Sequence, residues 1–369
     1  MFEVFGDIKK QISTSGIKEP DISSFTLTMM RLSMLLTLTG CVLVTARNYI
    51  GDNISCITGF KDQEHKAIEN YCFIASTFTI IDLGSDEAPH PGVGPIPIKE
   101  ECEDGAEDCD TEDNLRRHAY YQWVPMVLLL QAAIYYLPKF LWDQRDKGLF
   151  KDSIANLDKV SVDKHALKKR IESSAQYFKD SLNTHRNYAV CFLLCEMISF
   201  SIAVGNLYFT NTFLGGDFFH FGKHAVHYLT QSASSPDNPL NEVFPKVTKC
   251  TWYKYGASGT INTHDSMCVL PLNIVNEKTY ICLWIVYVAT ATFTGIVLLW
   301  HIILFCVPEV RNTFLVYMSR SSETKLNLQH LLPECNYGDW FLMYHYRKHM
   351  AYFKEWTTTL RKLNSKNIE

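Results

Sequence analysis

The sequence has no excess of basic residues, because its 35 Lys and Arg side chains are outnumbered by 39 Asp and Glu, for a formal net charge of −4. This balance argues against a protein that binds nucleic acid. The chain also lacks the low hydrophobicity of disordered proteins and the glycine content of collagen, since 47% of its residues are hydrophobic and only 18 of 369 are glycine. A folded protein with no nucleic-acid partner is therefore expected.

Several motifs that mark catalytic or redox sites are also missing. The chain contains no HExxH zinc-hydrolase pattern, no Walker phosphate loop, no GxSxG nucleophile elbow and no CxxC pair. We therefore expect neither an enzyme, nor a cofactor, nor a metal site.

The hydrophobic residues are concentrated in four long runs. A helix that crosses a bilayer needs about 20 mostly apolar residues, and runs of this length cover 25–46, 120–142, 188–210 and 279–307. Core helices of soluble proteins rarely lack a polar face over such a length, so the runs predict four transmembrane helices. A cleaved signal peptide is the rival interpretation of the first run, but the segment before it is long and carries acids as well as lysines.

The distribution of Lys and Arg predicts the orientation of these helices. Residues 143–187 contain 10 such side chains, whereas 52–118 and 211–278 contain 5 each. Basic segments remain in the cytoplasm, so both termini are expected there. The expected order is an N-terminal segment (1–24), transmembrane 25–46, extracellular 47–119, transmembrane 120–142, cytoplasmic 143–187, transmembrane 188–210, extracellular 211–278, transmembrane 279–307 and a cytoplasmic helical domain (308–369).

Half of the 12 cysteines fall in the two expected extracellular loops. An even number of cysteines in an oxidising compartment indicates a disulfide framework. Their spacing does not decide between bonds within one loop and bonds between the loops. The six are Cys56, Cys72, Cys102, Cys109, Cys250 and Cys268.

Several blocks, in order along the chain, resemble the innexin family, in particular insect innexins and the viral innexins of parasitoid-wasp viruses. The most characteristic is YYQWV, which opens the second hydrophobic run. The others cover the chain from end to end, and they are YIGD (49–52), PGVG (91–94), FPKVTKC (244–250), THDSMCVLPLNIVNEK (263–278) and CNYGDWFLMY (335–344).

The resemblance implies an all-α, four-helix transmembrane subunit of a large-pore channel, with disulfide-linked extracellular loops and a helical cytoplasmic domain. Innexin subunits form octameric hemichannels, which dock between adjacent cells at gap junctions of the plasma membrane and pass ions and small metabolites. The implied partners are identical or related innexin subunits, a hemichannel of the neighbouring cell and membrane lipids. The alternatives are a non-junctional hemichannel and a partner subunit that modifies other innexin channels.

The resemblance also implies the inter-loop disulfides Cys56–Cys268 and Cys72–Cys250. It places the N-terminal segment in the mouth of the pore, where a ring of Glu3 carboxylates would favour cations. A helix that rests on the membrane surface is the alternative for this segment. The residues expected to line the narrowest part of the pore are Phe2, Glu3, Val4 and Phe5.

Three residues within the hydrophobic runs invite an interpretation. Pro125 is expected to break the hydrogen-bond ladder of the second helix and to kink it, either as a gating hinge or as a static bend. Pro138 is expected to end the same helix. Glu196 lies deep in the third run, where an ionisable group is costly, so it is expected to bond to a neighbouring helix.

Two features depart from the usual innexin pattern. Asn53 is followed by Ile54 and Ser55, which makes it a candidate glycosylation site. Relative to that pattern, residues 100–113 are an insertion between PGVG and YYQWV, with 9 acidic residues out of 14. We expect a surface loop closed by a Cys102–Cys109 bond, although its charge could also concentrate cations or hinder docking.

Overall fold

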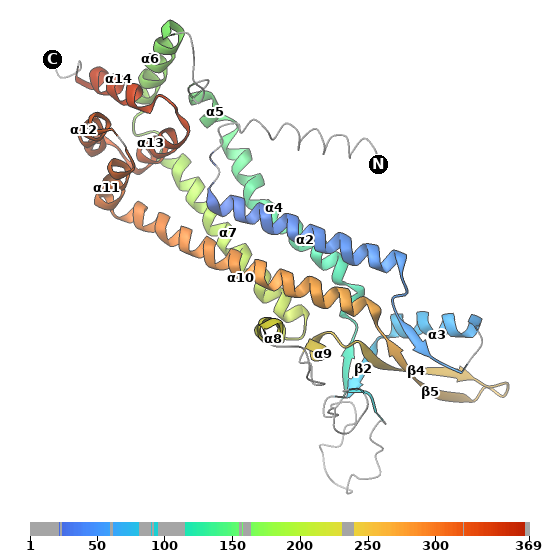
Figure 1. The fold of residues 1–369 in the computed structure, drawn as a ribbon. Coiled ribbons are helices and arrows are strands. Elements are labelled where there is room, and N and C mark those ends of the chain that lie inside the picture. The colour runs from blue at the N-terminus through green and yellow to red at the C-terminus, as the bar shows by residue number, and fades with distance from the viewer. Residues whose placement is uncertain are drawn as a thin grey trace. The chain divides into compact units, whose positions relative to one another are not determined.

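A computed structural model describes residues 22, 24–59, 62–80, 90, 92–94, 115–154, 157, 164–230, 240–319 and 321–365. Four helices of the described chain are long and apolar enough to cross a membrane, which confirms the four-helix transmembrane class. They are α2 (Phe25–Ile50), α4 (Val124–Asp146), α7 (Arg186–Phe213) and α10 (Pro271–Cys306) (Figure 1).

The bounds of all four helices differ from those of the hydrophobic runs, and two of the differences involve prolines. Helix α10 begins at Pro271 rather than at 279, because proline suits the first turn of a helix and the polar side chains that follow are buried in protein. Helix α4 continues past Pro138 to Asp146, so the expected termination at this proline is wrong. A membrane helix tolerates an internal proline when neighbouring groups satisfy the freed carbonyl.

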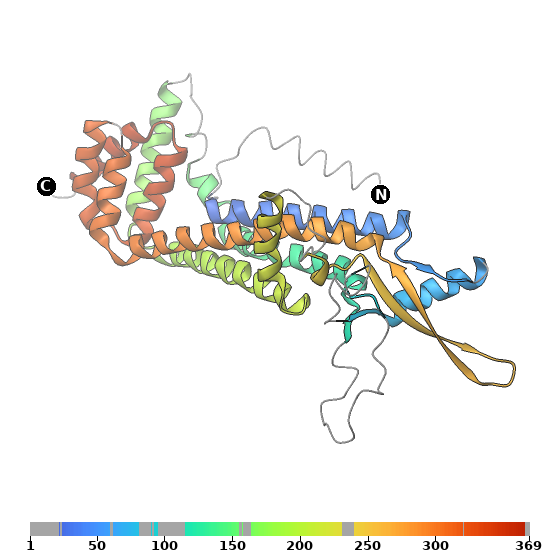
Figure 2. The ribbon, with the colours of Figure 1, turned by 60° about the horizontal axis from the view of Figure 1, so that its bottom comes forward.

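The chain forms two compact units, and the first consists of 1–31, 136–201 and 292–369. Besides the ends of the long helices, it contains a cluster of shorter helices around a core of large aromatic side chains, among them Trp142, Phe150, Phe178, Tyr346 and Trp356. Figure 2 shows the C-terminal helices of the cluster side by side. The short helices are α5 (Leu149–Ser153), α6 (Lys164–Asp180), α11 (Pro308–Met318), α12 (Ser322–Leu331), the 3-10 turn η3 (Leu332–Glu334), α13 (Tyr337–His349) and α14 (Phe353–Ser365).

The second unit consists of 32–135 and 202–291 and contains a five-stranded sheet that the hydrophobic pattern does not reveal. The strands are β1 (Ser55–Ile57), β2 (Thr77–Ile80), β3 (Leu115–His118), β4 (Val247–Tyr255) and β5 (Ile261–Val269). Their order is β1-β5-β4-β2-β3, and every pair is antiparallel. The segment after α2 and the segment after α7 therefore share one sheet. The short helices of this unit are α3 (Asp62–Ala75), η2 (Tyr120–Gln122), α8 (Phe218–Thr230) and α9 (Leu240–Val243).

A chain of buried side-chain hydrogen bonds connects all four long helices within the second unit. The hydroxyl oxygens of Thr37 in α2 and Tyr287 in α10 lie 3.1 Å apart, and Tyr287 also donates to Gln131 of α4. Gln131 in turn donates from its amide to the Thr210 hydroxyl of α7, over 2.8 Å. Such polar contacts between membrane helices contribute about 0.6 kcal/mol each on average, so the chain specifies how the helices face one another.

Candidate functional site

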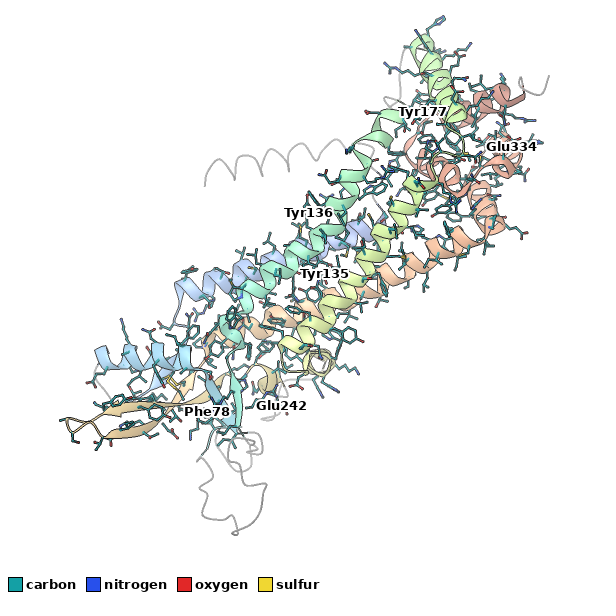
Figure 3. All side chains as sticks on the ribbon, turned by 180° about the vertical axis from the view of Figure 1, so that it is seen from behind. Phe78, Tyr135, Tyr136, Tyr177, Glu242 and Glu334 are labelled. Atoms are coloured by element: carbon teal, nitrogen blue, oxygen red, sulfur yellow. A yellow bond between two sulfur atoms is a disulfide. The ribbon has the colours of Figure 1, made fainter. Side chains whose placement is uncertain are left out.

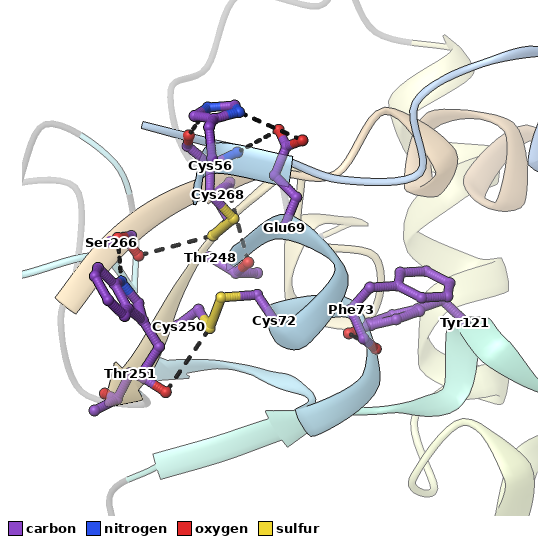
Figure 4. Close-up of a disulfide and its surroundings, with 12 residues drawn as sticks. Cys56, Glu69, Cys72, Phe73, Tyr121, Thr248, Cys250, Thr251, Ser266 and Cys268 are labelled. Atoms are coloured by element: carbon purple, nitrogen blue, oxygen red, sulfur yellow. Dashed lines mark hydrogen bonds and ion pairs between the residues drawn. A yellow bond between two sulfur atoms is a disulfide. The ribbon is translucent and has the colours of Figure 1, made fainter. Parts of the chain in front are cut away.

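Two disulfide bonds hold the sheet together, Cys56–Cys268 and Cys72–Cys250 (Figure 4). Cys56 of β1 lies directly opposite Cys268 of β5 in the strand ladder, and Cys72 of α3 reaches Cys250 of β4. Three of the sulfurs lie close enough together to hold a metal ion, but each is already oxidised to a disulfide. The arrangement is therefore a structural clamp between the two inter-helix segments.

Helix α3 is also held to strand β1 by hydrogen bonds. The backbone amide of Cys56 donates to Glu69, and a ring nitrogen of His65 lies 2.8 Å from the Cys56 carbonyl oxygen. His65 and Glu69, one helical turn apart, are 3.5 Å from each other. Helix α3, which carries Cys72 of the second disulfide, is thus also bonded to the strand that carries the buried Cys56 of the first.

The β4–β5 hairpin ends in exposed apolar side chains. Tyr253, Tyr255 and Ile261 are 53%, 70% and 59% exposed, whereas Trp252 is buried and donates from its indole to the Ser266 hydroxyl, over 2.9 Å. Exposed aromatic side chains on a rigid support are typical of protein-protein contact surfaces. The hairpin is accordingly a candidate contact surface for another copy of the chain.

The YYQWV block fastens the start of α4 to the first inter-helix segment. Tyr121 is buried and packs on Phe73 at the end of α3, with 5.2 Å between ring centroids, while the Gln122 amide donates to the Phe73 carbonyl. Tyr120 packs edge-on against Phe244, which precedes β4. The block therefore links the second long helix to both inter-helix segments.

Pro125 lies in the first turn of α4, just after the short 3-10 turn η2. The first four backbone N–H groups of a helix have no intrahelical acceptor, so a proline there removes no bond from the ladder. The expected break inside the helix is therefore wrong. A hinge at the junction between η2 and α4 stays a prediction.

The PGVG block packs against the sheet at a point that requires glycine. Gly92 has a φ of +75°, and a Cβ there would come within 3.0 Å of Thr79 in β2. Its carbonyl accepts a bond from the Ile80 amide. The Lys249 ammonium of β4 donates to the Gly94 carbonyl over 2.8 Å and pairs with Asp265 of β5 at 3.1 Å. The block thus contacts strands β2 and β4.

His118 is a buried histidine of β3 whose Nε2 lies 2.8 Å from the Thr79 hydroxyl oxygen. Burial, together with the nearby charge of Arg116, lowers the pKa of His118 from 6.5 to about 4. Below pH 6.5 the unfolded chain gains a proton that the folded chain does not accept until about pH 4. The sheet should therefore lose stability as the pH falls through this window.

We expect this loss to total roughly 3 kcal/mol, since one pKa unit corresponds to about 1.4 kcal/mol. Thermal melting of the purified protein at pH 7 and pH 4 measures it, and His118→Gln should melt with a weaker pH dependence. His90→Gln, at an exposed histidine of the same unit, is the control. An unchanged pH dependence in His118→Gln would show that another group is responsible.

The CNYGDW block attaches α13 to the start of α7. Asn336 caps α13, and the buried Asp339 carboxylate accepts the backbone amides of Asn336 and Asn183. His185 Nδ1 lies 3.0 Å from the same carboxylate. Gly338 is required here, because a Cβ would come within 2.5 Å of the backbone of His185 and Arg186. The sequence identifies this block only through its resemblance to a family. It does not reveal the contacts of the block, because Asn183 and His185 lie about 150 residues away in the chain.

Glu196 of α7 is fully buried and contacts Nδ1 of His301 in α10. The expected bond from Glu196 to a neighbouring helix is therefore present. The sequence does not identify the partner, because 105 residues separate the two and no periodic pattern connects them.

Several residues singled out from the sequence are not brought into a site. Phe2, Glu3, Val4 and Phe5 lie outside the described residues, as do Cys102, Cys109 and the rest of the acidic segment 100–113. Asn53 is described and half-buried, and its side-chain oxygen has no hydrogen-bond partner among the described residues.

Comparison with known proteins gives a consistent result. A family model described as Innexin matches residues 23–362. The chain is 34% identical to Innexin inx2 of Drosophila melanogaster, over 95% of this chain and 92% of that protein. It is 35% identical to Innexin inx2 of Schistocerca americana over the full length of both, and 35% identical to Innexin inx1 of the same species over 93% and 92%.

Proposed function

The chain belongs to the innexin family of gap-junction channel subunits, and we propose that its hemichannels dock between adjacent cells to pass ions and small metabolites. The observation that carries this proposal is the single sheet built from both inter-helix segments, clamped by two disulfides and ending in an exposed hairpin. A rigid surface loses little conformational entropy when it binds. Docking of two like hemichannels requires such a self-complementary patch.

In this proposal the sheet is extracellular and both termini are cytoplasmic. The excess of Lys and Arg in 143–187 supports this orientation, and disulfides form in an oxidising compartment. The cluster of short helices, which includes 164–180 and 308–365, then forms the cytoplasmic domain. The transmembrane segments proposed are the hydrophobic runs 25–46, 120–142, 188–210 and 279–307, which overlap the four long helices.

We assign the pore to an octamer of identical or related subunits, in line with the family architecture. Phe2, Glu3, Val4 and Phe5 would line its narrowest part, and the junction at Pro125 would act as the hinge. Asn53 would carry a glycan beside the membrane only if its half-buried side chain became accessible. The acidic segment 100–113 would concentrate cations at the outer surface.

Expression of this chain alone in paired cells tests the function. We expect a junctional conductance between the cells, because a docked channel joins the two cytoplasms. Single-cell membrane current, recorded in the same preparation, measures undocked hemichannels. Removal of residues 100–113 should leave the junctional conductance in place or increase it, since the negative charges of these segments would no longer repel one another.

Two other results would redirect the proposal. Membrane current without junctional current would indicate a non-junctional hemichannel. No current of either kind, with the protein at the cell surface, would indicate a subunit that acts only together with other innexins.

A further inference from the structure

An open cavity of about 730 Å³ lies in the first unit, between the end of α4, the short helix α5 and one face of α6. The contribution of α6 follows from its periodicity, because Arg170, Ser173, Ser174 and Tyr177 are spaced three to four residues apart and lie on the same side of the helix. Figure 3 marks Tyr177 on this helix. The channel function proposed above does not use this cavity.

Three cationic side chains line the cavity from two elements. Arg145 and Lys147 come from the end of α4 and the turn after it, and Arg170 comes from α6. All three are exposed, and none has an ion-pair partner among the described residues. No ion pair with a described residue neutralises these three charges, which favours an anion in the cavity.

Two carboxylates also face the cavity, and one of them is already engaged. Asp146 is buried, and its carboxylate accepts hydrogen bonds from the Tyr188 hydroxyl and from the backbone amide of Phe150. Asp152 is exposed at the rim. Three cationic side chains face two carboxylates, so the lining carries a net positive charge even when Asp146 is counted.

Hydroxyl groups complete the lining. Ser173 and Tyr177 present hydroxyls without a hydrogen-bond partner among the described residues, while the Ser174 hydroxyl donates to the Ser153 carbonyl and holds α5 against α6. Arginines and lysine beside free hydroxyl donors form the kind of site that phosphate oxygens prefer. The volume has room for more than one phosphate group.

We propose that this cavity binds a ligand with two or more phosphate groups. Arg145 lies in the last turn of a helix that crosses the membrane, so the site lies at the depth of lipid headgroups. Basic pockets at the end of transmembrane helices bind phosphorylated headgroups. A phosphoinositide headgroup and a soluble inositol polyphosphate share this chemistry. The proposed function enters at one point only, because the membrane orientation places the cavity at the inner leaflet.

Calorimetric titration of the purified full-length protein tests the site. The two probes are a short-chain phosphatidylinositol bisphosphate and inositol trisphosphate, both at physiological salt. The variant Arg145→Gln/Arg170→Gln should weaken binding by at least roughly tenfold, because it removes two charge-assisted hydrogen-bond donors to phosphate oxygens. The control Lys168→Gln/Lys169→Gln removes the same charge from α6 residues that do not line the cavity and should bind like the natural chain.

The outcomes separate the ligand sources and the alternatives. Binding of the lipid alone supports a headgroup site, and equal binding of both probes supports a soluble polyphosphate. Failure of the natural chain to bind either probe would overturn the proposal, as would an equal loss in the control variant. Thermal melting of each variant verifies folding, and the assay is independent of whether the chain forms junctional channels.

Discussion

Junctional current is expected to disappear when the disulfide between β1 and β5 is removed by Cys56→Ser/Cys268→Ser. These residues are 212 positions apart in the sequence, and loss of a native disulfide typically costs roughly 2–5 kcal/mol. Cys268 lies in β5, which is one of the two strands of the exposed hairpin. The proposed docking surface would therefore lose its rigid support. Paired-cell recording measures the effect.

A matched control separates this effect from the general loss of thiols. Cys282→Ser/Cys306→Ser removes two exposed free cysteines of α10 and should retain the junctional current. Surface labelling establishes whether the disulfide variant reaches the plasma membrane. Normal junctional current in a variant shown to lack the bond would contradict a docking role for the clamp.

The second large effect is expected at Asp339, where α13 meets the start of α7. Asp339→Ala would leave the backbone amide of Asn183 and the ring of His185 without their buried acceptor. Removing one partner of a buried, charged network typically costs 3–5 kcal/mol. The free energy of unfolding of the helical cluster should fall by about this amount, as measured by thermal melting of the purified protein.

Two further variants make the expectation specific. Glu323→Ala removes an exposed carboxylate that pairs with Lys354, and exposed pairs contribute only about 0–1 kcal/mol, so it should melt like the natural chain. Gly338→Ala should be destabilised like Asp339→Ala, because its Cβ would meet the backbone of His185. Unchanged melting of both Asp339→Ala and Gly338→Ala would exclude this contact as a support of the fold.

The sequence by itself determined the four long helices, because a run of about 20 apolar residues has few alternatives to a membrane helix. It also determined that Glu196 must find a partner, since an ionisable group at that depth is costly alone. The ends of the helices were less predictable. The start of α10 at Pro271 is accompanied by polar side chains that only the fold buries, and α4 continues past Pro138 although proline removes one bond from the helix ladder.

Only the tertiary structure decided the contacts between segments far apart in the chain. The strands at 55–57, 77–80 and 115–118 share one sheet with those at 247–255 and 261–269, because short strands acquire their pairing from partners rather than from their own pattern. The bond between Glu196 and His301 and the requirement for Gly338 also depend on approaches across 105 or more residues. The cavity beside α6 exists only because folding brings separate basic residues together, since spacing along a chain does not specify a distance in space.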